Sequence, residues 1–254
     1  MTTNDRQGSS RLPNERTLPF GLHAEEGSHL ALLLESLSAV ARQDLLAISE
    51  LHTVPAGTVV IPEGERSDQL GYIVDGTLAM KKRLPDGRTH IIGLLVPTDL
   101  YGRIFDGASA YRIETLTEAR LLSFDRAGFE RILAGAPEVE RMFVGEILGE
   151  LDAAREWILL LGGRKVVERV ASFLLILCRR RARELVPEPQ AAGPVRVHIP
   201  ISRTDLAQYL GARPESLSRA LHELERVKAI HMNDPYDFEL VDIARLVEIA
   251  GHDL

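Results

Sequence analysis

The chain has few cysteines and aromatic residues and no long apolar run. Cys178 is the single cysteine among 254 residues, so an internal disulfide is excluded. One cysteine also cannot hold an iron–sulfur cluster, which needs several thiolate ligands. No run of about 18 apolar residues is present, and the N-terminus is polar, unlike a signal peptide. We therefore expect a cytoplasmic protein with no membrane partner.

The chain also lacks an excess of positive charge. Its net charge is −7, and residues 196–254 hold seven Lys and Arg against ten Asp and Glu. Phosphate binding depends on local patches, however, and not on the overall charge. One such patch has seven basic residues and a single acid, Glu168: Arg164, Lys165, Arg169, Arg179, Arg180, Arg181 and Arg183. It could be a solvated helix face or a phosphate-binding surface, and the residues alone leave both open.

The order of sequence patterns predicts an α+β protein with a tail and three further parts. Residues 1–27 are rich in Thr, Asn, Ser, Gly and Pro, and we expect a flexible N-terminal tail. Residues 28–136 form the second part, in which leucines at helical spacing from 30 to 51 predict one or two helices. From 52 onward, short β-runs alternate with glycine turns, which predicts a small barrel or sandwich.

A long helix is predicted for residues 137–162. Its apolar residues alternate steps of three and four, as in a coiled-coil seam: Val144, Ile147, Leu151, Ala154, Ile158 and Leu161. The helix could pack on its own domain or pair with a second copy. We favour a homodimer interface, because a two-fold dimer also suits the pattern of residues 163–254 that follows.

Residues 163–254 carry the pattern of a winged helix-turn-helix. Ser202 can cap a first helix, and Gly211 stands where that helix must stop, since glycine adopts a left-handed turn at little cost. Pro214 suits the first turn of a second helix. A hairpin at 229–241 supplies the wing, and a last helix runs from 242 to about 250.

The second helix has an exposed face that suits DNA. Glu215 can accept a hydrogen bond from cytosine N4, and Arg219 can donate twice to guanine O6 and N7. Ser218 lies beside them on the same face. Glu215 and Arg219 could instead form an ordinary surface ion pair between residues four apart.

Three segments together resemble the Crp/Fnr family of bacterial transcription regulators. They are PAGTVVIPEGERSDQLGYIVDGTLAM, GELDAAREWILLLGGRKVVERVASFL and GARPESLSRALHELE. The resemblance covers the chain from about residue 30 to its end and is strongest to the Fnr/FixK branch, here without the iron–sulfur cysteines. It implies a cyclic-nucleotide-binding-like β-roll of jelly-roll type, a dimerisation helix and a winged helix-turn-helix.

The resemblance also implies a DNA target and its contacts. The target would be an inverted repeat close to TTGAT-N4-ATCAA, with Arg219 and Glu215 on the G·C pair and Ser218 beside a thymine. Arg164, Lys165, Ser202 and Arg213 are the expected phosphate contacts, and RNA polymerase is the expected protein partner. Arg213 stands where the branch usually has threonine and Pro214 replaces a branched apolar residue, so half-site preference could differ.

The signal that such a protein would sense is predicted mainly by exclusion. Cyclic-AMP binders of the family hold the phosphate with an arginine, but this chain has Ala108 at the comparable place, which disfavours cyclic AMP. Candidate axial ligands for haem are His23, His29, His52 and His90. Cys178 could be a redox-sensitive thiol or a small buried apolar residue. We favour an activator without a bound effector or cofactor.

Enzymes and other binding modules are weaker alternatives. A cupin-type metalloenzyme would need clustered histidines and a carboxylate on the roll, where His52 and His90 stand alone. An adaptor that only binds cyclic nucleotides would lack the second helix of the helix-turn-helix. A repressor differs from an activator only in surface contacts, which the sequence does not locate.

Overall fold

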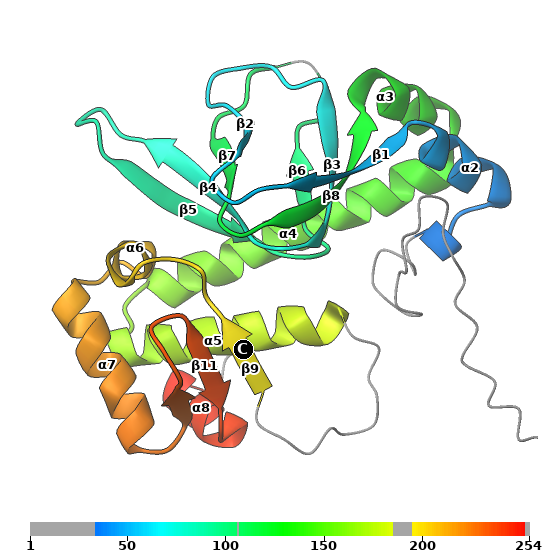
Figure 1. The fold of residues 1–254 in the computed structure, drawn as a ribbon. Helices are drawn as coiled ribbons and strands as arrows, with labels where there is room; N and C mark the ends of the chain where they lie inside the picture. Colours follow the sequence, from blue (N-terminus) through cyan, green and yellow to red (C-terminus); the bar gives the residue numbers. More distant parts are fainter. Residues whose placement is uncertain (1–33, 106, 185–194, 252–254) are drawn as a thin grey trace, which may run out of the picture.

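The structure is a computed structural model, and it describes residues 34–105, 107–184 and 195–251. A β-roll and a largely helical domain are joined by a long helix, α4 (Figure 1). The α+β class predicted from the sequence is confirmed. The roll precedes the helix-turn-helix in the chain, as the order of the sequence patterns indicates.

The roll consists of two four-stranded antiparallel sheets. One has the order β1-β8-β3-β6 and the other has the order β2-β7-β4-β5. Between them lie apolar side chains such as Ile73, Leu78 and Leu121, each at most 2% exposed. The bounds are β1 Ser49–Val54, β2 Val59–Ile61, β3 Gln69–Asp75, β4 Leu78–Arg83, β5 Thr89–Leu95, β6 Leu100–Gly102, β7 Arg112–Thr115 and β8 Ala119–Asp125.

Two short helices and the start of α4 cover the β1-β8-β3-β6 sheet. They are α2 (Ala39–Ala47) and α3 (Arg126–Gly135), and their core contains a chain of aromatic rings. The ring of Phe129 lies 5.5 Å from that of Phe124 on β8 and 5.8 Å from that of Phe143 on α4. These contacts attach α4 to the roll.

The prediction that helix extends to residue 51 is wrong. Helix α2 ends at Ala47, and the strand β1 begins two residues later at Ser49. Leu51 lies opposite Leu122 in the ladder between β1 and β8. Leucine spacing is compatible with both structures over so short a stretch, and pairing with a strand some 70 residues away decides between them.

Helix α4 (Pro137–Leu161) runs from the roll to the helical domain. Pro137 is tolerated because it lies in the first turn, where the backbone N–H has no partner within the helix. The helix ends before Gly162 and Gly163, and Gly163 has a left-handed backbone with φ of +66°. Both ends match the predicted helix within one residue.

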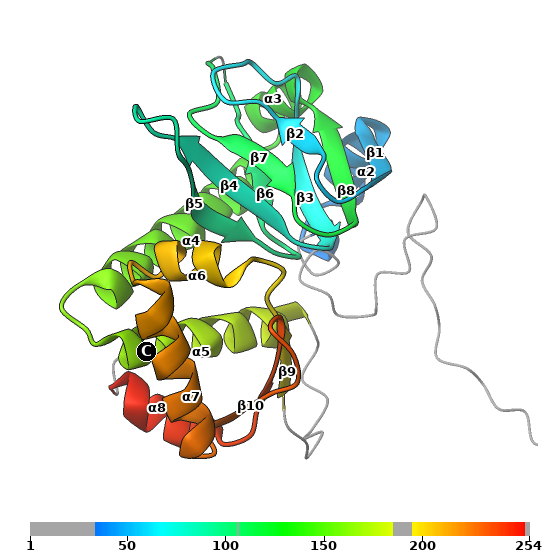
Figure 2. The ribbon, with the colours of Figure 1, turned by 60° about the vertical axis from the view of Figure 1, so that its left-hand side comes forward.

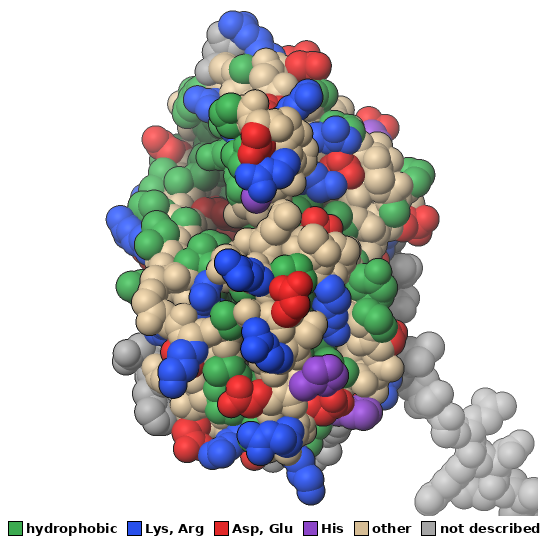
Figure 3. Space-filling view, turned by 90° about the vertical axis from the view of Figure 1, so that its left-hand side faces the viewer, with side chains coloured by type: hydrophobic (Ala, Val, Ile, Leu, Met, Phe, Trp, Pro, Cys, Tyr) green, Lys and Arg blue, Asp and Glu red, His purple; other side chains and the backbone are tan. Residues whose placement is uncertain are grey.

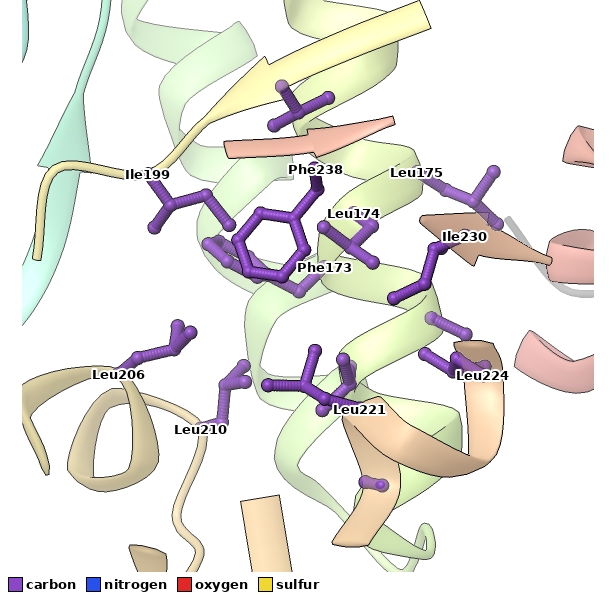
Figure 4. Packing of buried hydrophobic residues seen from close by; sticks show 14 of the residues in the cluster. Phe173, Leu174, Leu175, Ile199, Leu206, Leu210, Leu221, Leu224, Ile230 and Phe238 are labelled. Carbon is purple, nitrogen blue, oxygen red and sulfur yellow. The ribbon is translucent and has the colours of Figure 1, made fainter. Parts of the chain in front are cut away.

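The C-terminal domain is built around α5. Its core gathers side chains from every helix of the domain and from its sheet, including Phe173 and Leu174 from α5 and Phe238 from the wing (Figure 4). The sheet has the order β10-β11-β9. The bounds are α5 Val166–Glu184, β9 Val195–His198, α6 Arg203–Tyr209, α7 Pro214–Arg226, β10 Ile230–Met232, β11 Asp237–Leu240 and α8 Ile243–Ala250.

The two domains touch along α6. This helix lies against β5 of the roll, directly below the β4–β5 hairpin (Figure 2). Ala79 and Leu94 of the roll belong to the same apolar cluster as the core of the helical domain. The roll therefore holds the first helix of the helix-turn-helix in place.

Candidate DNA interface

The turn between α6 and α7 has the predicted backbone. The Ser202 hydroxyl accepts a hydrogen bond from the Asp205 N–H at 3.1 Å, which caps α6. At the other end Gly211 is left-handed, with φ of +61°, and its N–H donates to the Gln208 carbonyl. The Ala212 N–H donates to the carbonyl of Ala207, which is fully buried. These bonds turn the chain sharply into α7.

Arg169 of α5 completes this turn, a role that the sequence did not indicate. Its Nη1 donates to the carbonyl oxygens of Leu210 and Gly211, at 2.7 and 2.8 Å. These carbonyls belong to the end of α6, where no helical N–H remains to pair with them. Arg169 belongs to the basic patch predicted from the sequence, but its guanidinium faces the protein.

Helix α7 has one buried face and one exposed face. Leu217, Leu221 and Leu224 are at most 2% exposed. On the other face Glu215, Ser218 and Arg219 are all exposed. The Arg219 Nε donates to the backbone carbonyl of Glu215 at 3.3 Å. In the described part of the chain, the side chains of Glu215 and Arg219 form no ion pair with each other, so both charged groups face solvent.

The expected phosphate contacts differ in how they are oriented. Lys165 and Arg213 are exposed, and Arg213 occupies the N-cap position of α7 without a capping hydrogen bond from its side chain. Ser202 is exposed at the start of α6, and its hydroxyl donates to the Asp205 carboxylate at 2.7 Å. Basic side chains are spread over this face of the molecule, with acidic ones among them (Figure 3).

Arg164, another expected phosphate contact, forms internal hydrogen bonds. Its Nη1 donates to the Ala250 carbonyl at 2.8 Å and to the buried Ser172 hydroxyl at 3.2 Å. The guanidinium thus satisfies the end of α8, where a positive charge also suits the helix dipole. Arg180, Arg181 and Arg183 lie outside the side chains that the structure describes.

Arg203 attaches the wing to α6 and was not singled out by the sequence. Its guanidinium carbon lies 5.0 Å from the centre of the Phe238 ring, and its Nη2 is 3.9 Å from the Met232 sulfur. Burial lowers the pKa of Arg203, partly offset by the charge of Asp234. One signal could have found it: a cation in the first turn of a helix opposes the helix dipole.

Two family models match the two domains of this chain. The model of the Crp-like helix-turn-helix domain matches residues 168–249, and that of the cyclic nucleotide-binding domain matches residues 51–136. The transcriptional activator protein FnrL of Cereibacter sphaeroides is 36% identical over 198 residues, which are 78% of this chain and 79% of that protein. This chain belongs to the Crp/Fnr family.

This chain is also similar to two FixK proteins, one in sequence and one in structure. The nitrogen fixation regulation protein FixK of Bradyrhizobium diazoefficiens is 30% identical over 201 residues, covering 77% of this chain and 80% of that protein. The structure of FixK2 from Bradyrhizobium japonicum superposes with a TM-score of 0.70 at 26% identity, over 82% of this chain and all of that one. The resemblance to the Crp/Fnr family and to its FixK-like members is confirmed. This is a family of transcription regulators and not of enzymes.

The candidate sensor residues that the structure describes in this Crp/Fnr protein lie on different elements. His52 is on β1 and His90 is on β5, in different sheets, and His23 and His29 lie outside the described residues. Cys178 is partly buried on α5 and packs against the domain core. Across the described ranges, no three His, Cys, Asp or Glu residues could hold a metal ion together.

The remaining sensor position lies in the roll. Ala108, the residue that the sequence led us to expect in place of the phosphate-binding arginine of cyclic-AMP binders, is exposed between β6 and β7. No helix in the described ranges is long and apolar enough to cross a membrane.

Proposed function

We propose that this protein is a homodimeric transcription activator that binds an inverted repeat close to TTGAT-N4-ATCAA without a bound effector. The observation that carries the proposal is the exposed face of α7. Glu215, Ser218 and Arg219 present exposed hydrogen-bonding groups there, on a helix whose position is set by a complete helix-turn-helix. FnrL, which is named a transcriptional activator, supports the sign of regulation.

Each of the three residues has a chemical role at the half-site. The Arg219 guanidinium donates to guanine O6 and N7, and the Glu215 carboxylate accepts from the N4 amino group of the paired cytosine. Ser218 lies beside a thymine. Lys165, Ser202 and Arg213 surround this face and contact the phosphates, which sets the position and adds salt dependence without reading the sequence.

The dimer is expected to form along α4. All six residues of the seam predicted from the sequence are exposed, among them Ile158 at 69% and Val144 at 49%. Exposed apolar side chains in one stripe mark an interface. Two copies paired there place their recognition helices about one turn of DNA apart, roughly 34 Å, and an activator bound there contacts RNA polymerase.

The sequence of the roll supports the proposed absence of an effector. Ala108 has no group that could hold a cyclic phosphate in place of the expected arginine. Regulation would then depend on the amount of the protein. Control by haem or by the Cys178 thiol remains the alternative within the same family.

Fluorescence anisotropy tests the proposal. Protein without added ligand is titrated onto the TTGAT-N4-ATCAA duplex and onto a scrambled duplex, near physiological salt. We expect tight, selective binding by the wild type. Arg219→Ala should lose about 1–3 kcal/mol per half-site and discriminate less well at the guanine.

The matched control is Arg245→Ala, which removes an exposed arginine from α8 of the same domain. It should bind like the wild type. If Arg219→Ala bound the consensus as well as the wild type does, the assignment of Arg219 would be wrong. If the wild type bound both duplexes alike, the proposed target or the absence of an effector would be wrong.

A further inference from the structure

The exposed apolar stripe of α4 is wider than the predicted seam. Leu148 is 55% exposed and Leu159 is 66% exposed, and both lie beside the seam residues Ile147, Leu151 and Ile158. The side of α4 that carries Phe143, Trp157 and Leu160 packs on its own chain, and it flanks the seam. The exposed stripe therefore needs a cover from outside the chain, and under the proposed function this cover is a second copy.

A charged residue lies within this stripe. Arg155 comes one turn after Leu151 and one turn before Ile158 and Leu159, so three of its neighbours on the helix surface are apolar and the fourth is Asp152. Its side chain is 65% exposed, and its Nη1 lies 3.0 Å from the carboxylate of Asp152 on the same helix. Any second copy that covers the stripe must accommodate this guanidinium.

The second copy could pack on α4 in two arrangements, which differ in the groups that lie next to Arg155. If the contact is centred on Leu148, Arg155 and Leu159, Arg155 lies at the two-fold axis and faces Arg155 of the partner subunit. Like charges at that distance repel each other. If the contact follows the seam from Val144 to Leu161, Arg155 moves to the flank.

In the second seating the flanking charges are complementary. With Val144, Leu151 and Ile158 at the a positions of the heptad, Glu150 is a g residue and Arg155 is the e residue of the next heptad. In a parallel coiled coil these two positions of opposite chains lie side by side, and opposite charges there set orientation and partner choice. An antiparallel pairing would bring e beside e and g beside g.

We propose that Glu150 and Arg155 of each chain pair with Arg155 and Glu150 of the partner subunit, and that this reciprocal pair fixes the parallel, in-register dimer. The inference rests on the proposed dimer and adds how its two helices choose their register. Both residues are exposed, so their side chains can reach across the seam. On binding, Arg155 exchanges or shares its Asp152 partner.

Charge reversal in the full-length protein tests this pair. Glu150→Arg creates two repulsive arginine pairs across the dimer, and Arg155→Glu creates two repulsive glutamate pairs. We expect each to raise the dimer dissociation constant about tenfold or more, measured by analytical ultracentrifugation over a dilution series. The double variant E150R/R155E restores both pairs with reversed sign and should come within about threefold of the wild type.

Mixing the two single variants gives a second, independent measurement. A dimer of one E150R chain and one R155E chain has two attractive pairs and should form in preference to either homodimer. Native mass spectrometry of the mixture counts the three species directly. The matched control is Glu156→Arg, which makes the same charge change at an exposed position of α4 that faces away from the seam. It should dimerise like the wild type.

The outcomes separate this inference from the proposed function. If the wild type is a dimer and the single variants dimerise equally well, the reciprocal pair is wrong while the dimer stands. The pair is also wrong if the single variants fail to mix preferentially. A wild type that stays monomeric at micromolar concentration would overturn the dimer and the pair together.

Discussion

The indole ring of Trp157 stacks on the phenol ring of Tyr209, with centroids 4.3 Å apart and planes inclined by 25°. Phe173 meets both rings edge-on, at 5.9 Å from each. Trp157 belongs to α4, Phe173 to α5 and Tyr209 to the end of α6. Three helices thus meet in one aromatic cluster, which joins the helix of the proposed dimer directly to the DNA-reading unit.

Replacing Tyr209 by alanine should loosen the joint between these helices. The loss of ring burial and of the aromatic contacts should lower the free energy of unfolding by about 2–4 kcal/mol. Trp157 is the only tryptophan, so its fluorescence reports this cluster alone, and we expect a shift of its emission to longer wavelength. Tyr209→Phe keeps the ring and should leave the spectrum close to that of the wild type. Unchanged emission from Tyr209→Ala would contradict the packing.

Replacing Arg169 by methionine should destabilise the helix-turn-helix. The part-buried carbonyl of Leu210 would lose its donor at a cost of about 1–3 kcal/mol, and the exposed carbonyl of Gly211 would lose its donor at a smaller cost because water can replace it. Urea unfolding measures the loss. Lys165→Met removes an exposed charge from the same segment and should change stability by no more than about 0.5 kcal/mol. Equal stabilities of the two variants would refute the internal role of Arg169.

Tyr72 makes stability sensitive to alkaline pH. Burial, with a smaller effect of the Glu146 charge, raises the pKa of Tyr72 above its ordinary value of 10.0. A raised pKa in the folded state means that stability is intact below pH 10 and is lost as the pH rises beyond it. Tyr72→Phe has no ionisable group and should lose less stability between pH 9 and 11, as thermal melting would show.

The Tyr72→Phe variant also tests the hydroxyl at neutral pH. The Tyr72 oxygen is buried, and it has no hydrogen-bond partner in the described part of the chain. Removing it should leave stability unchanged or raise it by up to about 1–2 kcal/mol. A clear loss of stability at pH 7 would mean that the hydroxyl is satisfied.

Asp234 should make the wing turn sensitive to acid. Its carboxylate accepts hydrogen bonds from the Tyr236 and Asp237 N–H groups, at 2.6 and 2.9 Å. These bonds hold the pKa of Asp234 below its ordinary value of 3.8, and the bond from Tyr236 has the larger effect. The stabilisation is therefore present above about pH 4 and is lost as the pH falls further. In thermal melts, the deficit of Asp234→Ala against the wild type should shrink as the pH falls from 5 to 3. A deficit that stays constant would contradict this.

Local sequence patterns determined where several helices of this protein begin and end. Ser202, Gly211 and Pro214 mark the ends of α6 and α7 because caps, left-handed glycines and first-turn prolines act through the nearest backbone groups. The seam of α4 was predictable in the same way, since its spacing follows from the geometry of one helix. These features need no knowledge of the rest of the chain.

The tertiary structure decided what depends on distant neighbours. Leu51 became part of a strand because β8 pairs with it, and Arg164 and Arg169 turned inward because the ends of α8 and α6 need donors. The sequence does not show whether a basic side chain faces solvent or the end of a helix. Only the packed chain brings such a carbonyl to the arginine, because the two residues lie far apart in the sequence.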